Sequence, residues 1–274
     1  MLFGTGSLLY RLYNISRSLT ISRYTMLTDN QLLRYSRQVL LPDLDISGQE
    51  KLLASHVLLI GLGGLGSPIA MYLAGAGVGT LTLADFDEVD ISNLHRQIAH
   101  STADIGINKA QSAKNTVLAI NPDIAVQTIE KSIGEAGMLD YIKDKQVDLI
   151  VDATDNFASR HAINRLSLAA QIPLVSGAAI RLEGQISVFD PHQADSPCYA
   201  CLYPENGDMA ETCAQAGVLG PAVGTIACMQ ATETLKILAE FGQPLVGRVL
   251  LFDAKHTEWR SLTLKKDPQC AVCG

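Results

Sequence analysis

The segment Gly61-Leu62-Gly63-Gly64-Leu65-Gly66 has the composition of a loop that binds phosphate groups. Residues 57–60 before it have the pattern of a buried parallel strand, and residues 67–76 after it carry apolar side chains at helical spacing. A strand that turns on glycines into a helix directs free N–H groups at an anion, and glycine lets a phosphate approach the backbone closely. The segment therefore predicts a nucleotide site, to which it supplies Gly61, Gly63, Gly64 and Gly66.

An acidic residue follows at the distance expected for a ribose contact. The next predicted strand, residues 79–84, ends at Asp85, close to the offset of roughly 20 residues at which a carboxylate binds a ribose hydroxyl. Glycines also form ordinary tight turns, but here the strand, the helix and the acid all agree with a nucleotide. The loop itself fits NAD as readily as ATP.

Two cations beyond this acid favour ATP. Arg96 lies in the run DFDEVDISNLHRQ, and Lys109 lies on a helix predicted over residues 107–120. A dinucleotide held for hydride transfer needs little beyond helix N–H groups, whereas a triphosphate under attack needs fixed cations that spread its charge. Either cation taken alone could be an ordinary surface charge.

A second carboxylate, Asp155, follows another buried strand pattern at residues 147–151. Asp155 and Asn156 begin a helix predicted over residues 157–171, so Asp155 could be the cap of that helix. It also lies at the carboxyl end of a parallel strand, where open α/β sheets bind their ligands, and a carboxylate beside a triphosphate would hold Mg²⁺. Position alone leaves both roles open.

Two C-x-x-C pairs predict a tetrahedral Zn²⁺ site made of Cys198, Cys201, Cys270 and Cys273. The long gap between the pairs means that the metal would join the C-terminal region back to the body of the domain. Disulfides are the competing explanation. An acidic chain without a secretion signal indicates a reducing compartment, where zinc is favoured.

These motifs together resemble the ThiF/MoeB/HesA family, the bacterial relatives of ubiquitin-activating enzymes. The resemblance rests on the runs GLGGLGSP, DFDEVDISNLHRQ, DATDN and SGAAIRLEGQ, and it extends from about Leu27 to the last residue. It implies a homodimeric α/β enzyme that uses Mg·ATP to adenylate the C-terminal glycine of a small ubiquitin-like carrier, often with a structural zinc. The residues placed around ATP by this match are Gly64, Asp85, Asp87, Ser92, Asn93, Arg96, Lys109, Asp155 and Asn156.

The resemblance gives two further residues a role. Arg37, in the run RYSRQ, matches an arginine that reaches into the partner subunit's site. Cys213 matches a cysteine that links covalently to the activated carrier in some relatives, while other relatives keep the cysteine without needing it. We expect Arg37, Arg96, Lys109 and Asp155 to take part in catalysis, and for Cys213 a covalent role and an inert thiol are both open.

The implied chemistry agrees with these residue types. A glycine carboxylate is already ionised at neutral pH, so its attack on the α-phosphorus of ATP needs no general base. The obstacle is repulsion between an anion and a polyanion. Arginine, lysine and Mg²⁺ reduce that repulsion, and binding aligns the two reactants.

The sequence also bears on which carrier protein would be activated. The stretch SGAAIRLEGQISVF resembles the branch that activates molybdopterin synthase, whereas residues 202–208 and 259–264 resemble the thiazole-synthesis branch, and we expect the first. No rhodanese-like segment follows Cys273, so we expect sulfur from a separate protein. The alternatives are an NAD-dependent oxidoreductase, for which no proton donor stands out, and a nucleotide-binding partner that has lost the chemistry.

The predicted helices and strands that position these residues indicate an α/β fold. The resemblance implies that residues 27–274 form a single adenylyltransferase domain. Residues 27–180 form a Rossmann-like, mostly parallel sheet with helices on both faces. Residues 181–274 form a C-terminal lobe with antiparallel strands at 185–190, 248–253 and 259–264 and a helix at 221–241. The zinc would tether this lobe to the nucleotide-binding core.

Composition limits the classes of partner. The chain has 274 residues, is 47% hydrophobic and carries a net charge of −7, which argues against nucleic acid, and no apolar stretch is long enough for a membrane span. Residues 1–25 contain arginine, serine and tyrosine but no acid. They suit a mitochondrial transit peptide or upstream sequence read from an earlier start codon, with Met26 as the natural start. We favour the second interpretation and a cytoplasmic protein.

Overall fold

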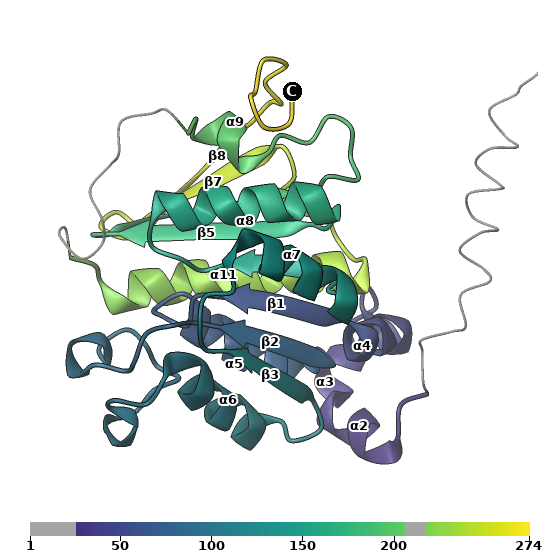
Figure 1. Cartoon of the computed structure of the whole chain (residues 1–274). Coiled ribbons are helices and arrows are strands. Elements are labelled where there is room, and N and C mark those ends of the chain that lie inside the picture. The colour runs from purple at the N-terminus through teal and green to yellow at the C-terminus, as the bar shows by residue number, and fades with distance from the viewer. Residues whose placement is uncertain (1–25, 206–216) are drawn as a thin grey trace, which may run out of the picture.

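The computed structural model describes residues 26–205 and 217–274, which form a mixed α/β fold around one eight-stranded sheet (Figure 1). The strand order is β3-β2-β1-β4-β5-β6-β7-β8. The strands are β1 His56–Ile60, β2 Thr80–Ala84, β3 Ala125–Ile129, β4 Leu149–Asp152, β5 Leu174–Ile180, β6 Glu183–Phe189, β7 Arg248–Asp253 and β8 Glu258–Thr263.

The half of the sheet from β3 to β5 is parallel, as the sequence predicts. Its central strand, β1, is covered on both faces, since Leu58 and Leu59 point to opposite sides and both are fully buried. The register places Leu59 beside Leu83 of β2 and Val151 of β4. Burial on both faces explains why these strands are continuous apolar runs.

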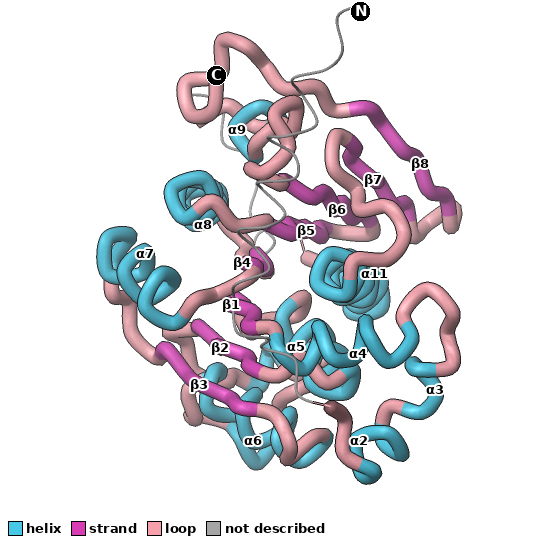
Figure 2. Tube along the Cα trace, turned by 90° about the vertical axis from the view of Figure 1, so that its right-hand side faces the viewer, coloured by secondary structure: helices cyan, strands magenta, loops and turns pink. Residues whose placement is uncertain are grey.

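Helices cover both faces of this sheet (Figure 2). Helices α4, α5, α6 and α11 contribute to one apolar core, and α7 and α8 to the core on the opposite face. The helices are α2 Asp29–Arg34, α3 Ser36–Val39, α4 Asp45–Ala54, α5 Gly66–Ala76, α6 Lys109–Ile120, α7 Gly134–Lys145, α8 Phe157–Ala170, α9 Tyr199–Leu202 and α11 Gly220–Ala239, with short 3-10 turns η1 Ile91–Asn93 and η2 Thr102–Asp104. None of the helices in the described residues is long and apolar enough to cross a bilayer.

Several predicted helices have slightly different ends in the structure; α11, for example, spans Gly220–Ala239 rather than residues 221–241. Helix α6 begins at Lys109 rather than at residue 107, because the side chain of Asn108 accepts the N–H of Ala110 (2.9 Å) and so caps the helix. Helix α8 ends one residue early, because Gln171 adopts a left-handed conformation (φ 54°).

The half of the sheet from β6 to β8 is antiparallel, which confirms the predicted extension. Strand β6 follows β5 through a tight turn at Arg181 (φ 55°) and pairs with it along its whole length. The two halves therefore share one continuous ladder of hydrogen bonds. Burial decreases toward the edge, and every residue of β8 is exposed.

The helices before β1 pack at the C-terminal end of α5. The side-chain amides of Gln38 and Gln49 both donate to the carbonyl of Ala76 (3.1 and 3.0 Å). Tyr35 is buried against Gly77, which caps α5 with φ 84°. These contacts fix α3 and α4 at the end of α5 farthest from the glycine loop.

Candidate nucleotide site and metal centre

The glycine loop joins β1 to α5, as predicted. Gly61 has φ 92°, and a Cβ there would lie 2.7 Å from the carbonyl oxygen of Ala153, while a Cβ on Gly66 would collide with the carbonyl of Gly61. Glycine at these two positions is therefore required by the turn itself. Gly64 lies against the Arg96 side chain, since its Cβ would be 3.3 Å from Cγ of Arg96. The loop thus contacts the segment that carries one of the predicted cations.

Asp85 lies beside this loop at the carboxyl end of β2. Its carboxylate accepts the N–H of Leu62 (2.6 Å) and the N–H of Asp87 (2.9 Å). Burial raises the pKa of Asp85, although these two hydrogen bonds and the charge of Lys109 act in the opposite direction. The acid is held rigidly at the position where a carboxylate contacts ribose in this type of fold.

Lys109 is held at the same edge of the sheet. Its ammonium group is 2.9 Å from a carboxylate oxygen of Asp87, and its side chain is only 8% exposed, whereas that of Asp87 is 75% exposed. Asn108, which caps this helix, also donates to the carbonyl of Asp85 (3.1 Å). The structure therefore brings Asp85, Asp87 and Lys109 together.

Arg96 is positioned by the turn that precedes it. Its guanidinium donates to the side-chain oxygen of Asn93 (3.2 Å) and to the carbonyl of Ser92 (3.3 Å). Gln97 also donates to the Asn93 side chain (2.8 Å). Ser92, Asn93 and Arg96 thus form one hydrogen-bonded unit beside the glycine loop.

The structure separates the two roles that the sequence left open for Asp155. Helix α8 is capped by Asn156, whose side chain accepts the N–H of Ser159 (2.9 Å). Asp155 is exposed, and its side chain accepts a long hydrogen bond (3.4 Å) from the amide of Asn156. The preceding turn is fixed by the buried carboxylate of Asp152, which accepts from Thr154 and Ser176. The carboxylate of Asp155 is therefore not occupied in capping the helix.

Asp155 and the glycine loop belong to one edge of the sheet. The N–H of Ala153 donates to the carbonyl of Ile60 (2.9 Å), so the turn after β4 lies directly beside the turn after β1. In Figure 1 the arrows of β1 and β2 end at the same side of the molecule. From β1 the chain crosses to β2 on one side, whereas β4 lies on the other, and such a reversal is where open α/β sheets bind nucleotides.

One predicted residue, Arg37, lies elsewhere. Arg37 is exposed in α3, next to Gln38, which bonds to the C-terminal end of α5. Helix α5 has 11 residues and is about 16 Å long, so Arg37 is far from the glycine loop at the other end of that helix. Cys213 lies outside the described residues.

A cavity that no sequence motif predicts extends from Asp155 over the antiparallel half of the sheet. Its volume is about 410 Å³. Phe157 and Tyr203 form one wall, and the hydroxyl of Tyr203 donates to the side chain of Gln185 (2.7 Å) on β6. The strands contribute further lining residues, among them Ala178, Ile180, Leu251, Asp253 and Arg260.

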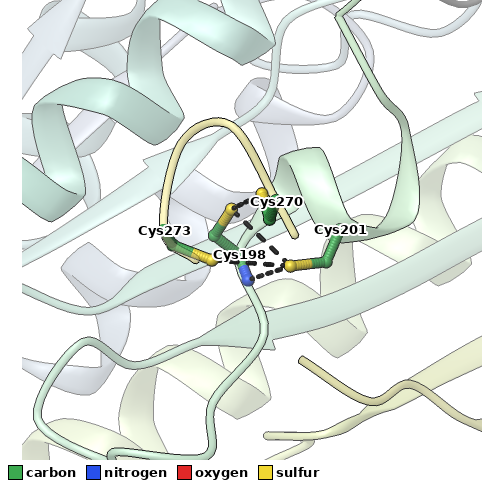
Figure 3. A group of neighbouring side chains, drawn as sticks. All are labelled: Cys198, Cys201, Cys270 and Cys273. Carbon is green, nitrogen blue, oxygen red and sulfur yellow. Dashed lines mark hydrogen bonds between the residues drawn. The ribbon is translucent and has the colours of Figure 1, made fainter. Parts of the chain in front are cut away.

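The four cysteines predicted to bind zinc lie together (Figure 3). Their sulfur atoms are all within 4.8 Å of one another, and the nearest pairs are Cys201 with Cys273 (3.5 Å) and Cys198 with Cys270 (3.8 Å). Four thiolates at about 2.3 Å from a tetrahedral Zn²⁺ are about 3.8 Å apart, so the observed spacing fits the metal. All cysteines among the described residues are free, which agrees with the expected metal site rather than with the competing disulfides.

The thiol pKa values at this cluster are shifted in both directions. Burial raises the pKa of Cys198 and of Cys273, whereas at Cys270 the effect of burial is outweighed by hydrogen bonds that lower its pKa. A bound Zn²⁺ would stabilise the thiolate form of all four cysteines. Two of the ligands belong to the start of α9 and two to the segment after β8, so a bound metal would join these segments.

Comparison with known proteins agrees with this architecture. A model of the ThiF family matches residues 35–272. The chain is 46% identical over 248 residues to a molybdopterin-synthase adenylyltransferase of Escherichia coli, covering 90% of this chain and 98% of that protein. It is 44% identical to the sulfur carrier protein ThiS adenylyltransferase of the same organism, covering 90% and 97%.

A solved structure is similar over nearly the whole chain as well. The crystal structure of PaaA superposes with a TM-score of 0.75 at 25% identity, covering 97% of this chain and 84% of that one. Family model, relatives and fold all lead to one assignment: the chain belongs to the ThiF family.

Proposed function

We propose that this protein is an ATP-dependent adenylyltransferase that activates the C-terminal glycine of a ubiquitin-like sulfur-carrier protein and releases pyrophosphate. The observation that carries the proposal is the grouping of the glycine loop, Asp85, Arg96 and Lys109 at one edge of the sheet in a chain related to carrier adenylyltransferases. The relatives give no support to the alternative of an NAD-dependent oxidoreductase. Of the two carriers, we favour that of molybdopterin synthase.

The ribose and the phosphates of ATP each have matching groups. Asp85 would bind the ribose hydroxyls, and backbone N–H groups of the glycine loop would bind phosphate oxygens. Arg96 would spread phosphate charge in the transition state. Lys109 would exchange its present partner, Asp87, for a phosphate group.

Asp155 would hold Mg²⁺. Its carboxylate is exposed at the edge of the sheet and is free of the capping role, which Asn156 performs. An oxygen ligand of this kind, completed by phosphate oxygens and water, suits the octahedral geometry of Mg²⁺. The ion would neutralise charge on the departing pyrophosphate.

The cavity beside Asp155 would receive the carrier's C-terminal tail. Its volume is about 410 Å³, and its apolar lining from Ala178, Ile180 and Leu251 suits a narrow chain end. Attack by a carboxylate oxygen forms a bond to the α-phosphorus as the bond to the β-phosphate oxygen breaks. The products are the carrier acyl-adenylate and pyrophosphate, and a separate protein would then supply sulfur.

The active unit would be a homodimer in which Arg37 serves the partner's site. Arg37 is too far from its own glycine loop to act there. Leu33 and Leu40, on either side of it, are 77% and 71% exposed, which is the exposure expected of an interface viewed in one subunit alone. The four cysteines would bind one structural Zn²⁺ per chain.

ATP–pyrophosphate exchange tests the proposal directly. We expect radiolabelled pyrophosphate to enter ATP only when a carrier ending in Gly-Gly is present, with the molybdopterin-synthase carrier faster than the thiazole carrier. The control is the same carrier with its C-terminal carboxylate amidated, which cannot attack. Tight NADH binding without carrier-dependent exchange would contradict the proposal.

A further inference from the structure

His100 lies at the junction of three segments that carry the candidate nucleotide site, and its residue type gives no sign of this in the sequence. It is 7% exposed. Its Nε2 is 2.9 Å from the carbonyl oxygen of Leu62 in the glycine loop, and its Nδ1 is 2.8 Å from the hydroxyl of Ser112 on α6. Leu62 and Ser112 are themselves buried.

The partners of the His100 ring indicate which of its two nitrogens carries the proton. The carbonyl of Leu62 can only accept, so Nε2 of His100 carries the proton and donates it. The neutral ring then accepts the Ser112 hydroxyl at Nδ1. Burial lowers the pKa of His100, and the nearby charge of Lys109 acts in the same direction, while the hydrogen bond to Leu62 opposes them. A neutral ring in one tautomer agrees with both contacts.

This hydrogen bond determines how the Leu62–Gly63 peptide is oriented. In a trans peptide the C=O and the following N–H point in opposite directions. Because the carbonyl of Leu62 points inward to the buried ring, the N–H of Gly63 must point outward, away from the core. The buried hydroxyl of Ser67 donates to the same carbonyl (3.2 Å), so His100 makes the shorter of the two side-chain contacts that hold this peptide. Gly63 has no Cβ that would restrict the peptide further.

The contacts of His100 connect this peptide to the rest of the site. Ser112 lies one helical turn after Lys109, on the same face of α6. The backbone N–H of His100 donates to the carbonyl of Gln97, whose side chain holds Asn93. On its other side, Leu62 donates its N–H to Asp85.

We infer that His100 is a positioning residue for the nucleotide: it holds the Leu62–Gly63 peptide so that the N–H of Gly63 faces a phosphate of bound ATP. This inference rests on the proposed function, because it assigns the outward N–H to that nucleotide. His100 itself does not touch the nucleotide and acts through the loop.

A matched pair of substitutions separates this role from simple packing. In His100→Gln the side-chain amide can occupy the place of Nε2 and still donate to Leu62, but the contact to Ser112 is lost. In His100→Asn the shorter side chain can accept from Ser112 near the place of Nδ1 but cannot reach Leu62. Each variant keeps one hydrogen bond and loses one, so their losses of thermal stability should be similar.

Direct ATP binding to the purified chain, measured by calorimetry without carrier, is the first readout. We expect His100→Asn to weaken ATP binding by about three- to tenfold, the worth of one hydrogen bond, while His100→Gln recovers most of the affinity. In carrier-dependent exchange the loss should appear in KM for ATP and leave KM for the carrier unchanged. If His100→Asn does not fold, Ser112→Ala gives the same test with a smaller expected loss, because it frees the ring to change tautomer.

The outcomes are distinct. Parent-like ATP affinity in both the Asn and Gln variants would overturn the inference and leave the proposed function standing. Equal loss in both variants, in step with their thermal stability, would show that His100 serves only the core. A parent chain that does not bind ATP would remove the proposed function and this inference with it.

Discussion

The parallel and antiparallel halves of the sheet hold their functional residues by different means. At the carboxyl ends of β1, β2 and β4, buried side chains and backbone groups fix each other, as Leu62 is fixed by Asp85 and His100. Beyond β6 burial decreases, β8 is wholly exposed, and the cysteine cluster lies at the end of this half. The proposed nucleotide region is therefore organised by its core, whereas the region of the proposed tail cavity would depend on a metal bound by the four cysteines.

The largest expected effect comes from removing charged side chains of the proposed nucleotide region, which tests the difference between the two halves. Arg96→Ala and Asp155→Ala should each lower ATP–pyrophosphate exchange by about 10²–10³-fold, because each removes preorganised stabilisation of phosphate charge. Lys51→Ala is the matched control, since this lysine pairs with Glu240 on the surface (2.7 Å) and should leave exchange unchanged. Parent-rate exchange in Asp155→Ala would show that this carboxylate binds no essential metal.

The proposed dimer can be tested by mixing two inactive chains. Arg37→Ala and Asp155→Ala should each be inactive, but after subunit exchange a 1:1 mixture should recover about one quarter of the parent activity. Half of the dimers are then mixed, and each mixed dimer has one site that lacks both residues and one that is intact. A mixture that stays inactive after subunit exchange is verified by mass would contradict the action of Arg37 across the dimer.

Removing the metal should affect the antiparallel half selectively. Elemental analysis should find one Zn²⁺ per chain, and Cys270→Ser should destabilise β7 and β8 locally by several kcal/mol, roughly the scale of zinc coupling to folding in small domains. Hydrogen exchange would locate the loss, and carrier KM should rise while ATP affinity stays within about twofold. Cys228→Ser, outside the cluster, is the control. Equal loss of protection in β1 and β2 would contradict the division into two regions.

The smallest expected effect concerns the cap of α8. Asn156→Ala should lower the free energy of unfolding by about 1 kcal/mol, because it removes the acceptor for the N–H of Ser159. Asn156→Ser should keep most of that stability, and Asp155→Ala should cost little because this residue does not cap the helix. Urea denaturation of the three variants measures the difference. A larger loss in Asp155→Ala than in Asn156→Ala would reverse the two assignments.

Much of this molecule could be predicted from local pattern. The glycine run, Asp85 and the buried strands lie close together in sequence, and the paired C-x-x-C motifs identify the metal ligands. The ends of helices were less predictable, because whether Asn108 caps α6 depends on which of several polar residues adopts the capping geometry. For the same reason, the sequence alone could not decide whether Asp155 or Asn156 caps α8.

Contacts between distant segments could not be predicted. His100 meets Leu62 across 38 residues, and Tyr203 meets Gln185 across 18 and forms a wall of the cavity that no motif indicates. A buried histidine has no sequence periodicity that would distinguish it from an ordinary core residue. The role proposed for it rests on its contacts to Leu62 of the glycine loop and Ser112 of α6.

The cysteine cluster also has a consequence for how the chain matures. Cys270 and Cys273 follow all eight strands along the chain, and each is 72 residues beyond its nearest sulfur partner, so the ribosome exposes them only after the sheet has been synthesised. Metal capture is therefore expected to be the last step of folding, acting on a body whose parallel half is already formed. Zinc starvation should then yield a chain with a formed nucleotide region but a protease-sensitive C-terminal region, and pulse-labelling with limited proteolysis would show it.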